Sequence, residues 1–385
     1  MANKKQLKYQ GFEQGPIRPP SEASSLLIRL TRNCPWNRCA FCPVYKGTSF
    51  SVRPPDHVIK DIDLIKFQMD RIQEYSSNGI IERESANTLW NQTPPSQQIE
   101  FHAALNWFAN KMTSVFLQDA NSLIMKPHDL TETLSHLRNL FPDIQRVTSY
   151  ARSHTISRIG QNDLDAIARS GLNRIHIGLE SGSDAVLSLV KKGVDKLSHI
   201  KAGQKVKLAK MELSEYIMPG LGGQELSKEH ALETADAINQ INPDFIRFRS
   251  LAIPSTIPLH DMVNQGQFVP CSDIQIAREI HLMISNFKNI QSVITSDHVL
   301  NLFEDVEGRL PEDRNKILNI IETFLNLPPN EQMIFQVGRR LGIMRFLSQL
   351  SHAPLRNQVE SICNQMNITP GNVDASIQEI ITRFI

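Results

Sequence analysis

The sequence predicts an α/β fold, namely a six-stranded partial β/α barrel followed by a mainly helical C-terminal region. From residue 26 onward, short apolar runs rich in β-branched residues alternate with longer helical patterns, which is typical of repeated βα units and a parallel sheet. Six such runs occur before residue 260. Six strands favour a closed or nearly closed barrel over a short open sheet.

The expected strands and helices of the barrel follow from these runs. The strands are predicted at 25–31, 113–118, 144–150, 173–179, 213–218 and 244–250. Helical patterns lie between them at 129–141, 161–172 and 228–241. The segment 80–112 interrupts the first crossover between strands and looks like an insertion.

Beyond Pro258 no further strand is expected, and the pattern becomes helical. Ser272 and Gln275 form a capping box ahead of an apolar stripe, so a helix should begin there. Further helical patterns cover 315–325 and 331–350, and a helical interpretation of 295–308 places Asp297, His298 and Asn301 on neighbouring positions. We therefore divide the chain into an N-terminal extension (1–25), a barrel core (26–260) and a helical region (261–385).

Composition sets limits on the class of protein. Hydrophobic residues make up 41% of the 385 residues and charged residues 21%, which is ordinary globular usage. The formal net charge of +1 supplies no overall attraction for nucleic acid, so a nucleic-acid partner is not indicated. The N-terminus lacks the apolar core of a signal peptide, and no run of about 18 apolar residues occurs. We expect a cytoplasmic protein without a membrane partner.

Three of the five cysteines fall within nine residues, in LTRNCPWNRCAFCPVYKG. Four residues separate Cys34 from Cys39, and two separate Cys39 from Cys42. Structural zinc takes four ligands, usually as two pairs, whereas three thiolates suit an iron–sulfur cluster that leaves one iron open. Three thiols grouped by chance are the structural alternative. Cys271 and Cys363 stand alone, and we interpret them as inert thiols, although a radical enzyme could use one as a hydrogen donor.

This cysteine loop resembles that of the radical S-adenosylmethionine (SAM) superfamily, whose members place three cysteines after the first barrel strand. The usual spacing is three then two, so the present loop has one residue more between its first two cysteines. The resemblance extends over about 26–260 and includes GLESGSDAVLSLVKKG (178–193) and YIMPGLGG (216–223). The first of these segments looks like the equivalent one in oxygen-independent coproporphyrinogen oxidases. The family implies a 4Fe-4S cluster on Cys34, Cys39 and Cys42, with the open iron chelating SAM.

The resemblance also implies residues that contact SAM from the cysteine loop and the fourth strand. Phe41, just before the third cysteine, matches the family position near the adenine. Glu180 at the strand end matches a contact to the ribose or methionyl part, and Lys192 matches a basic partner of the SAM carboxylate. A structural alternative for Lys192 is a cation in the last helical turn before Gly193, where the helix dipole favours it.

Two further strand ends correspond to family contacts. By resemblance, Ile217 and Gly220 pack against the adenine after the fifth strand. After the second strand many relatives have a glycine-rich loop that binds the SAM amino group. Here LQDAN (117–121) occupies that place without a glycine, so Gln118 and Asp119 are the corresponding candidates.

Charged side chains within the strands should point into the barrel, because helices cover its outer face. In the fourth strand the expected inward set is Arg174, His176, Gly178 and Glu180. Tyr150 and Arg152 share the same rim by position. Arg247 and Arg249 lie on one face of the sixth strand, which suits an anionic ligand, although pairing with a barrel carboxylate such as Glu215 explains them equally well.

The family chemistry implies that a flavodoxin or ferredoxin reduces the cluster and that SAM is cleaved to a 5′-deoxyadenosyl radical. This radical abstracts hydrogen from a substrate, and the two arginines of the sixth strand would suit an anionic substrate. The substrate stays unknown, and the enzyme would be an oxygen-sensitive oxidoreductase or transferase. No second cluster or cobalamin domain is expected, because the remaining cysteines are far apart and the first strand begins near residue 25. Alternatives are a cluster- or haem-binding carrier without radical chemistry, and a zinc-stabilised RNA-binding module.

Overall fold

The structure, a computed structural model, describes residues 8–382 of the chain. These residues form two units. The first unit comprises residues up to Pro35, then Val44–His176 and Lys205–Glu212. The second comprises Trp36–Pro43, Ile177–Gln204 and the chain from Leu213 onward. The cysteine loop and the strand at 174–180 both cross from one unit to the other.

The first unit is built on parallel strands. β1 (Leu26–Arg29), β4 (Ser114–Gln118) and β5 (Arg146–Ala151) are neighbours in that order, and β6 (Arg174–Glu180) follows β5. Leu26 is in register with Val115, and Ser114 with Arg146. A small antiparallel pair, β2 (Thr31–Arg32) and β3 (Ser51–Val52), stands on either side of the cysteine loop in sequence.

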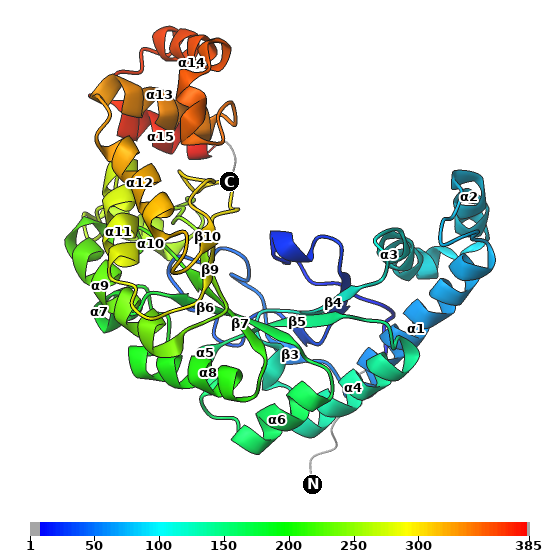
Figure 1. The fold of residues 1–385 in the computed structure, drawn as a ribbon. Helices are drawn as coiled ribbons and strands as arrows, with labels where there is room; N and C mark the ends of the chain where they lie inside the picture. Colours follow the sequence, from blue (N-terminus) through cyan, green and yellow to red (C-terminus); the bar gives the residue numbers. More distant parts are fainter. Residues whose placement is uncertain (1–7, 383–385) are drawn as a thin grey trace. The chain divides into compact units, whose positions relative to one another are not determined.

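Helices cover the strands of the first unit, and several begin where the sequence supplies a proline. α1 (Pro55–Glu74) and α4 (Pro127–Leu140) both have proline in their first turn, where the missing N–H costs nothing. α1, α4 and α6 (Gln161–Arg169) lie side by side in that order (Figure 1). The predicted insertion forms α2 (Arg83–Gln92) and α3 (Gln98–Ala109), and α3 packs on α1. The remaining short helices of this unit are η1 (Pro20–Glu22), η2 (Pro95–Gln97), η3 (Ser122–Ile124) and α5 (Ser153–Ile156).

The strands of the second unit continue the order β6, β7, β8, β9, β10. β7 (Glu212–Ile217) and β8 (Phe245–Phe248) are parallel, and Ser214 is in register with Phe245. β9 (Val293–Thr295) is parallel to β8, whereas β10 (Gly308–Arg309) runs antiparallel to β9. The predicted fold class is confirmed, because all six expected strands form and join a mostly parallel sheet with helices between them.

The helices of the second unit follow local signals in the sequence. α9 (Gly223–Ile241) ends at Asn242, whose φ of 50° is the left-handed conformation typical of a helix C-terminus. α11 (Asp273–Ser285) begins with the predicted capping box of Ser272 and Gln275, which is confirmed. α7 (Asp184–Leu189), α9 and α11 lie on one side of the unit (Figure 1). The other helices near the strands are α8 (Lys196–Leu208) and α10 (Pro258–Asn264).

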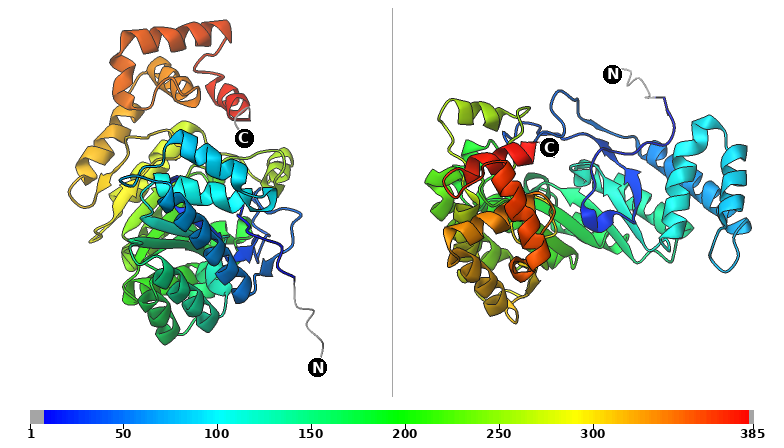
Figure 2. Two further views of the ribbon diagram at one scale, coloured as in Figure 1. Left: turned by 90° about the vertical axis from the view of Figure 1, so that its right-hand side faces the viewer. Right: turned by 90° about the horizontal axis from the view of Figure 1, so that it is seen from above.

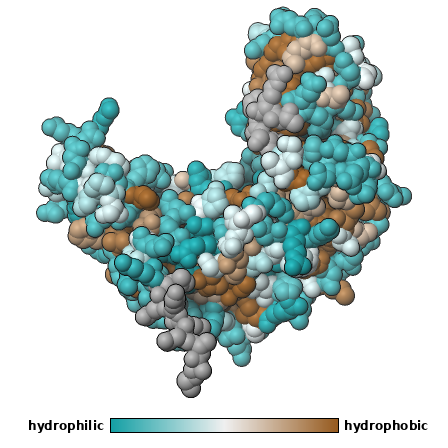
Figure 3. All heavy atoms as spheres, turned by 180° about the vertical axis from the view of Figure 1, so that it is seen from behind, coloured by the Kyte–Doolittle hydropathy of each residue, from teal (hydrophilic) through white to brown (hydrophobic). Residues whose placement is uncertain are grey.

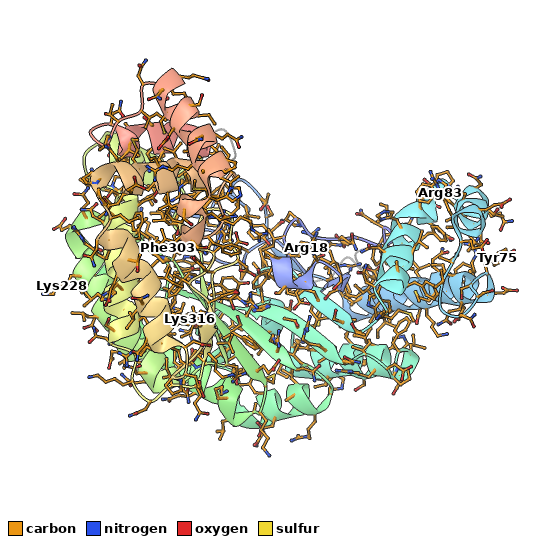
Figure 4. All side chains as sticks on the ribbon, turned by 45° about the horizontal axis from the view of Figure 1, so that its top comes forward. Arg18, Tyr75, Arg83, Lys228, Phe303 and Lys316 are labelled. Carbon is orange, nitrogen blue, oxygen red and sulfur yellow. The ribbon has the colours of Figure 1, made fainter. Side chains whose placement is uncertain are left out.

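The C-terminal helices form a group of their own within the second unit. α12 (Arg314–Leu325) leads to α13, α14 and α15, which cluster together in both views of Figure 2. Phe303 lies at the base of this group and packs against Phe324 and Phe335, whereas Lys228 on α9 lies on the outer side (Figure 4). The remaining elements are α13 (Pro329–Arg340), η4 (Leu347–Ser351), α14 (Ala353–Gln365) and α15 (Val373–Thr382).

Three expectations for the C-terminal half are wrong. Strands do occur after Pro258, because β9 and β10 extend the sheet; both are too short to show an alternating pattern. The helix expected over 331–350 ends at Arg340, where a turn carries the chain through Gly342 at a φ of 70°. Residues 296–302 form a loop and not a helix, and Asn301 is buried there.

Within residues 8–382, no helix is long and apolar enough to cross a membrane. Hydrophilic side chains cover most of the face drawn in Figure 3, and hydrophobic residues are exposed in smaller areas among them.

Candidate cofactor site

The cysteine loop follows β2, and its three thiols are each half-buried. Asn33 and Asn37 adopt positive φ angles of 67° and 47°, so the chain turns sharply on both sides of Cys34. Cys34 belongs to the first unit, and Cys39 and Cys42 to the second. Three half-buried thiols within nine residues have the donor chemistry of an iron–sulfur cluster. With the side chains in their present positions, however, no three His, Cys, Asp or Glu side chains among the described residues are arranged to bind a metal ion.

The second half of the loop is anchored within the second unit by its backbone. The N–H of Ala40 donates to the carbonyl of Val190 at 2.8 Å, and the carbonyl of Ala40 accepts from the N–H of Leu259 at 3.0 Å. The indole of Trp36 donates to the carbonyl of Lys191 at 2.7 Å. Ala40 and Phe41 are buried in an apolar cluster against which Cys39 and Cys42 pack. Cys39 and Cys42 are therefore held on a fixed apolar base.

Lys192, Glu180 and Phe41, predicted separately as SAM contacts, come together in the second unit. The Lys192 ammonium lies 2.9 Å from a carboxylate oxygen of Glu180 and 5.5 Å from the centre of the Phe41 ring. Both charged side chains are about one-eighth exposed, at 13% and 12%. Gly178 leaves room for this pair, because a Cβ there would lie 2.2 Å from the Glu180 carboxylate. A side chain at position 178 would therefore require the Glu180 carboxylate to move.

Ile217 and Gly220 lie at the end of β7 and just beyond it. Ile217 is fully buried, and Gly220 turns the chain with a φ of 84°. The N–H of Gly220 donates to a carboxylate oxygen of Glu279 on α11 at 2.7 Å, and the Ser227 hydroxyl donates to the other oxygen at 2.5 Å. His230 lies 3.5 Å from the same carboxylate. Sequence reasoning missed Glu279, although a carboxylate within the apolar stripe of 273–285 was a usable signal.

Gln118 and Asp119, at the end of β4, form hydrogen bonds with other residues of the first unit. The Gln118 amide donates to the carbonyl of Ile17 and accepts from the N–H of Gly15, each at 2.8 Å. Asp119 is fully buried and accepts from Arg29 at 2.8 Å and from the Tyr45 hydroxyl. Both side chains therefore hold the N-terminal segment and the cysteine loop to β4, and their contact with SAM stays a prediction.

Tyr150, at the end of β5, packs edge-on against Phe116 and lies 5.6 Å from the ring centre of His176. His176 is buried, and its ring lies 3.9 Å from the buried Glu22 carboxylate. The backbone N–H of Arg152 donates to the Asn121 side chain at 3.0 Å. Tyr150 is thus part of an aromatic contact across neighbouring strands of the first unit.

The two arginines expected on one face of the sixth strand differ in the structure. Arg247 on β8 is buried and lies 3.2 Å from both the Asp297 carboxylate and the Ser214 hydroxyl. Arg249 lies beyond the end of β8 and is exposed. The carboxylate that pairs with Arg247 is therefore Asp297, in the loop after β9, and not Glu215. Arg247 is therefore paired with a carboxylate, as the structural alternative expected, but the carboxylate is that of Asp297.

Glu215 on β7 is fully buried, and among the described residues neither of its carboxylate oxygens has a hydrogen-bond partner. Burial in this apolar setting raises the pKa of Glu215 well above the ordinary value, and the nearby charge of Glu180 raises it further, while Lys192 opposes both. The buried setting of Glu215, near the pair of Glu180 and Lys192, therefore favours the protonated carboxyl group.

Comparison with known proteins gives distant relatives. No family model matches this chain. It is 20% identical over 267 residues to the tRNA uridine(34) acetyltransferases of Methanocaldococcus infernus and Methanocaldococcus jannaschii. The match covers 66% of this chain and 48% or 47% of theirs, so the chain spans about half the length of these curated relatives.

Solved structures similar to this chain include several radical SAM enzymes. An N-terminally truncated Elp3 of Methanocaldococcus infernus has a TM-score of 0.42, with 16% identity over 52% of this chain and 53% of that one. The radical SAM methyltransferase TsrM of Kitasatospora setae, with cobalamin and a 4Fe-4S cluster bound, has a TM-score of 0.41, with 13% identity over 88% and 61%. The cobalamin-dependent SAM radical enzyme OxsB, with SAM bound, has a TM-score of 0.44, with 13% identity over 92% and 57%.

Of these similar structures, that of TsrM holds a 4Fe-4S cluster and that of OxsB holds SAM. The likeness to coproporphyrinogen oxidases is corrected, because the curated relatives are tRNA uridine(34) acetyltransferases. The segment at 178–193 suggested that likeness, and in the structure it supplies Gly178 and the contact between Lys192 and Glu180.

Proposed function

We propose that this protein is a radical SAM enzyme that holds one 4Fe-4S cluster on Cys34, Cys39 and Cys42 and cleaves SAM reductively. The observation that carries the proposal is the three-cysteine loop. Its second half, which contains Phe41, is fixed beside Lys192. In this proposal the thiol side chains turn toward one another when the cluster is assembled, while the backbone contacts of Ala40 keep the loop in place.

When bound, the cluster supplies one electron, received from a flavodoxin or ferredoxin, that splits SAM into methionine and a 5′-deoxyadenosyl radical. The chain's own residues bind and orient SAM. Lys192 pairs with the SAM carboxylate, and Glu180, already hydrogen-bonded to Lys192, holds the ammonium in position. The buried Phe41 ring packs near the adenine and helps to exclude water.

We propose an RNA as the first substrate class to test, with transfer to a tRNA base as the reaction type. The support is the similarity to two tRNA uridine(34) acetyltransferases over 66% of this chain. A net charge of +1 gives RNA no overall attraction, so binding would rest on a local surface. We place the protein in the reducing cytoplasm, where three thiols in one loop stay available to iron.

The experiment is anaerobic reconstitution with iron and sulfide, followed by reduction with dithionite in the presence of SAM. We expect about four irons per chain and formation of 5′-deoxyadenosine, measured by liquid chromatography. Adding total tRNA should increase 5′-deoxyadenosine formation if RNA is the substrate. Stoichiometric zinc without iron would contradict the cluster, and a cluster without 5′-deoxyadenosine would support the carrier alternative instead.

A further inference from the structure

A buried histidine of α9, His230, contacts the residues that follow two neighbouring strands, β6 and β7. Its ring nitrogen Nδ1 lies 2.7 Å from the hydroxyl oxygen of Ser181, just after β6. The other ring nitrogen, Nε2, lies 3.2 Å from the carbonyl oxygen of Met218, just after β7. Because a carbonyl oxygen can only accept, Nε2 donates to it, and the neutral ring then accepts at Nδ1 from the Ser181 hydroxyl. One imidazole therefore links two strand ends.

The segment after β6 is held against α9 at the next two residues as well. The N–H of Gly182 donates to the Thr234 hydroxyl at 2.9 Å. A Cβ at Gly182 would lie 2.3 Å from the carbonyl oxygen of Glu233, so the two backbones approach closely. The Ser183 hydroxyl donates to the Glu229 carboxylate at 2.6 Å. Three consecutive residues after β6 are therefore hydrogen-bonded to side chains of one helix.

The segment after β7 is held by the same network. The N–H of Met218 donates to the carbonyl of Glu180 at 3.0 Å, which joins the two strand ends directly. The N–H of Gly220 donates to Oε1 of Glu279 at 2.7 Å, and Nε2 of His230 lies 3.5 Å from the same oxygen. The imidazole therefore lies between the end of β6 and the turn at Gly220.

His230 and Thr234, one helical turn apart, are the two polar side chains among the buried residues of α9. The other buried residues of this helix are Gly223, Ala231, Ala235, Ala237, Ile238 and Ile241. A buried polar side chain costs free energy unless it forms hydrogen bonds. Both side chains bond to the segment after β6, and His230 also bonds to the residue after β7. The polar part of this helix face is therefore directed to the strand ends.

We propose that His230 is a positioning residue for SAM. By joining Ser181 to Met218, it fixes the distance between the two segments that supply Glu180 and Gly220. The imidazole is fully buried, so it acts through these segments and does not touch SAM itself. The inference rests on the proposed function, in which Glu180 and Gly220 both contact SAM. A binding residue keeps its geometry only when the groups behind it hold it in place.

The test uses two substitutions that each keep one of the two contacts. The amide of His230→Asn reaches the place of Nδ1 and that of His230→Gln the place of Nε2, so neither variant bridges both partners. Ser181→Ala removes the Nδ1 contact from the strand side and decides the matter if a histidine variant folds poorly. Ile238→Val, at a buried position of the same helix, lowers stability without removing a hydrogen bond and is the matched control.

The first measurement is amide hydrogen exchange of the full-length protein without iron or SAM, read by mass spectrometry. Peptides covering 178–186 and 216–223 should exchange roughly five- to tenfold faster in the His230 and Ser181 variants, the factor expected when one hydrogen bond is lost. The second measurement is SAM affinity after reconstitution, which should fall by roughly tenfold, the scale known for residues that support metal ligands. Iron content should match that of the unmodified chain, and Ile238→Val should change neither measurement.

Three results would overturn the inference and leave the proposed function standing. Unchanged hydrogen exchange in the His230 variants would show that the strand ends are held without the imidazole. Unchanged SAM affinity in either His230→Asn or His230→Gln would show that SAM binding does not need the bridge. An equal loss of affinity in Ile238→Val would assign the effect to stability in general. Absence of SAM binding by the unmodified reconstituted protein, in contrast, would contradict the proposed function and this inference together.

Discussion

The ammonium of Lys192 lies 2.9 Å from the Glu180 carboxylate, and Gly178 provides the space in which they meet. A lysine that only capped the last turn of its helix would extend along the helix axis toward the carbonyl groups. Lys192 instead turns back to the end of β6 and covers the face of Phe41 at 5.5 Å. The position of the ammonium is therefore set by Glu180 and Phe41 and not by a helix end.

Replacing Lys192 by alanine should weaken SAM binding to the reconstituted protein by roughly ten- to a hundredfold. A charge-assisted contact to a carboxylate contributes about 1.5 to 3 kcal/mol, and each 1.4 kcal/mol is about tenfold in affinity. Iron content should stay the same. Lys201→Ala, an exposed lysine on α8, serves as the matched control. Unchanged SAM affinity together with a lower melting temperature would assign Lys192 a purely structural role.

Alanine at Cys34, Cys39 or Cys42 should each reduce iron in the reconstituted protein to near background, because a cluster on three thiolates does not survive the loss of one. Cys271→Ala and Cys363→Ala should retain the iron of the unmodified chain. Both of these thiols are buried, and burial raises their pKa values, so the reactive thiolate is disfavoured. Iron and acid-labile sulfide analysis decides the matter, and iron loss on replacing Cys271 or Cys363 would contradict a single three-cysteine site.

Glu215→Gln should stabilise the protein, and the gain should increase with pH. The folded pKa of Glu215 is raised above its unfolded value, so the folded chain binds the extra proton and loses stability as pH rises above about 4.5. Glutamine has no such proton to lose. Melting temperatures of the two proteins at pH 5 and pH 8 test this expectation. A difference that is constant or shrinks toward pH 8 would show that Glu215 is ionised in the folded protein.

Removing Glu279 should loosen the turn at Gly220. The Glu279 carboxylate accepts from the Gly220 N–H and the Ser227 hydroxyl and is 2% exposed, so Glu279→Ala leaves one buried and one half-buried donor without this acceptor. Each hydrogen bond to a charged group contributes about 1.5 to 3 kcal/mol. We expect a clear fall in the free energy of unfolding in urea. Glu225→Ala, exposed on α9, should cost little, and similar losses in both variants would refute a specific role for Glu279.

Sequence reasoning succeeded where the signal is local and failed where it depends on distant contacts. The six parallel strands were predictable because each is a run of apolar, β-branched residues between helical patterns. β10 was not predictable, because two residues carry no periodicity and the strand exists only through its pairing with β9. The helix expected over 295–308 does not form, because Asn301 bonds to the backbone of Phe248 and Ser250, which lie about 50 residues away.

For the candidate site, the order of residues was sufficient to group Cys34, Cys39 and Cys42, because their spacing is a property of the chain and survives in any fold. The meeting of Lys192, Glu180 and Phe41 was decided by tertiary structure. A strand end, the turn after a helix and a loop 140 residues earlier approach one another only when the βα units pack.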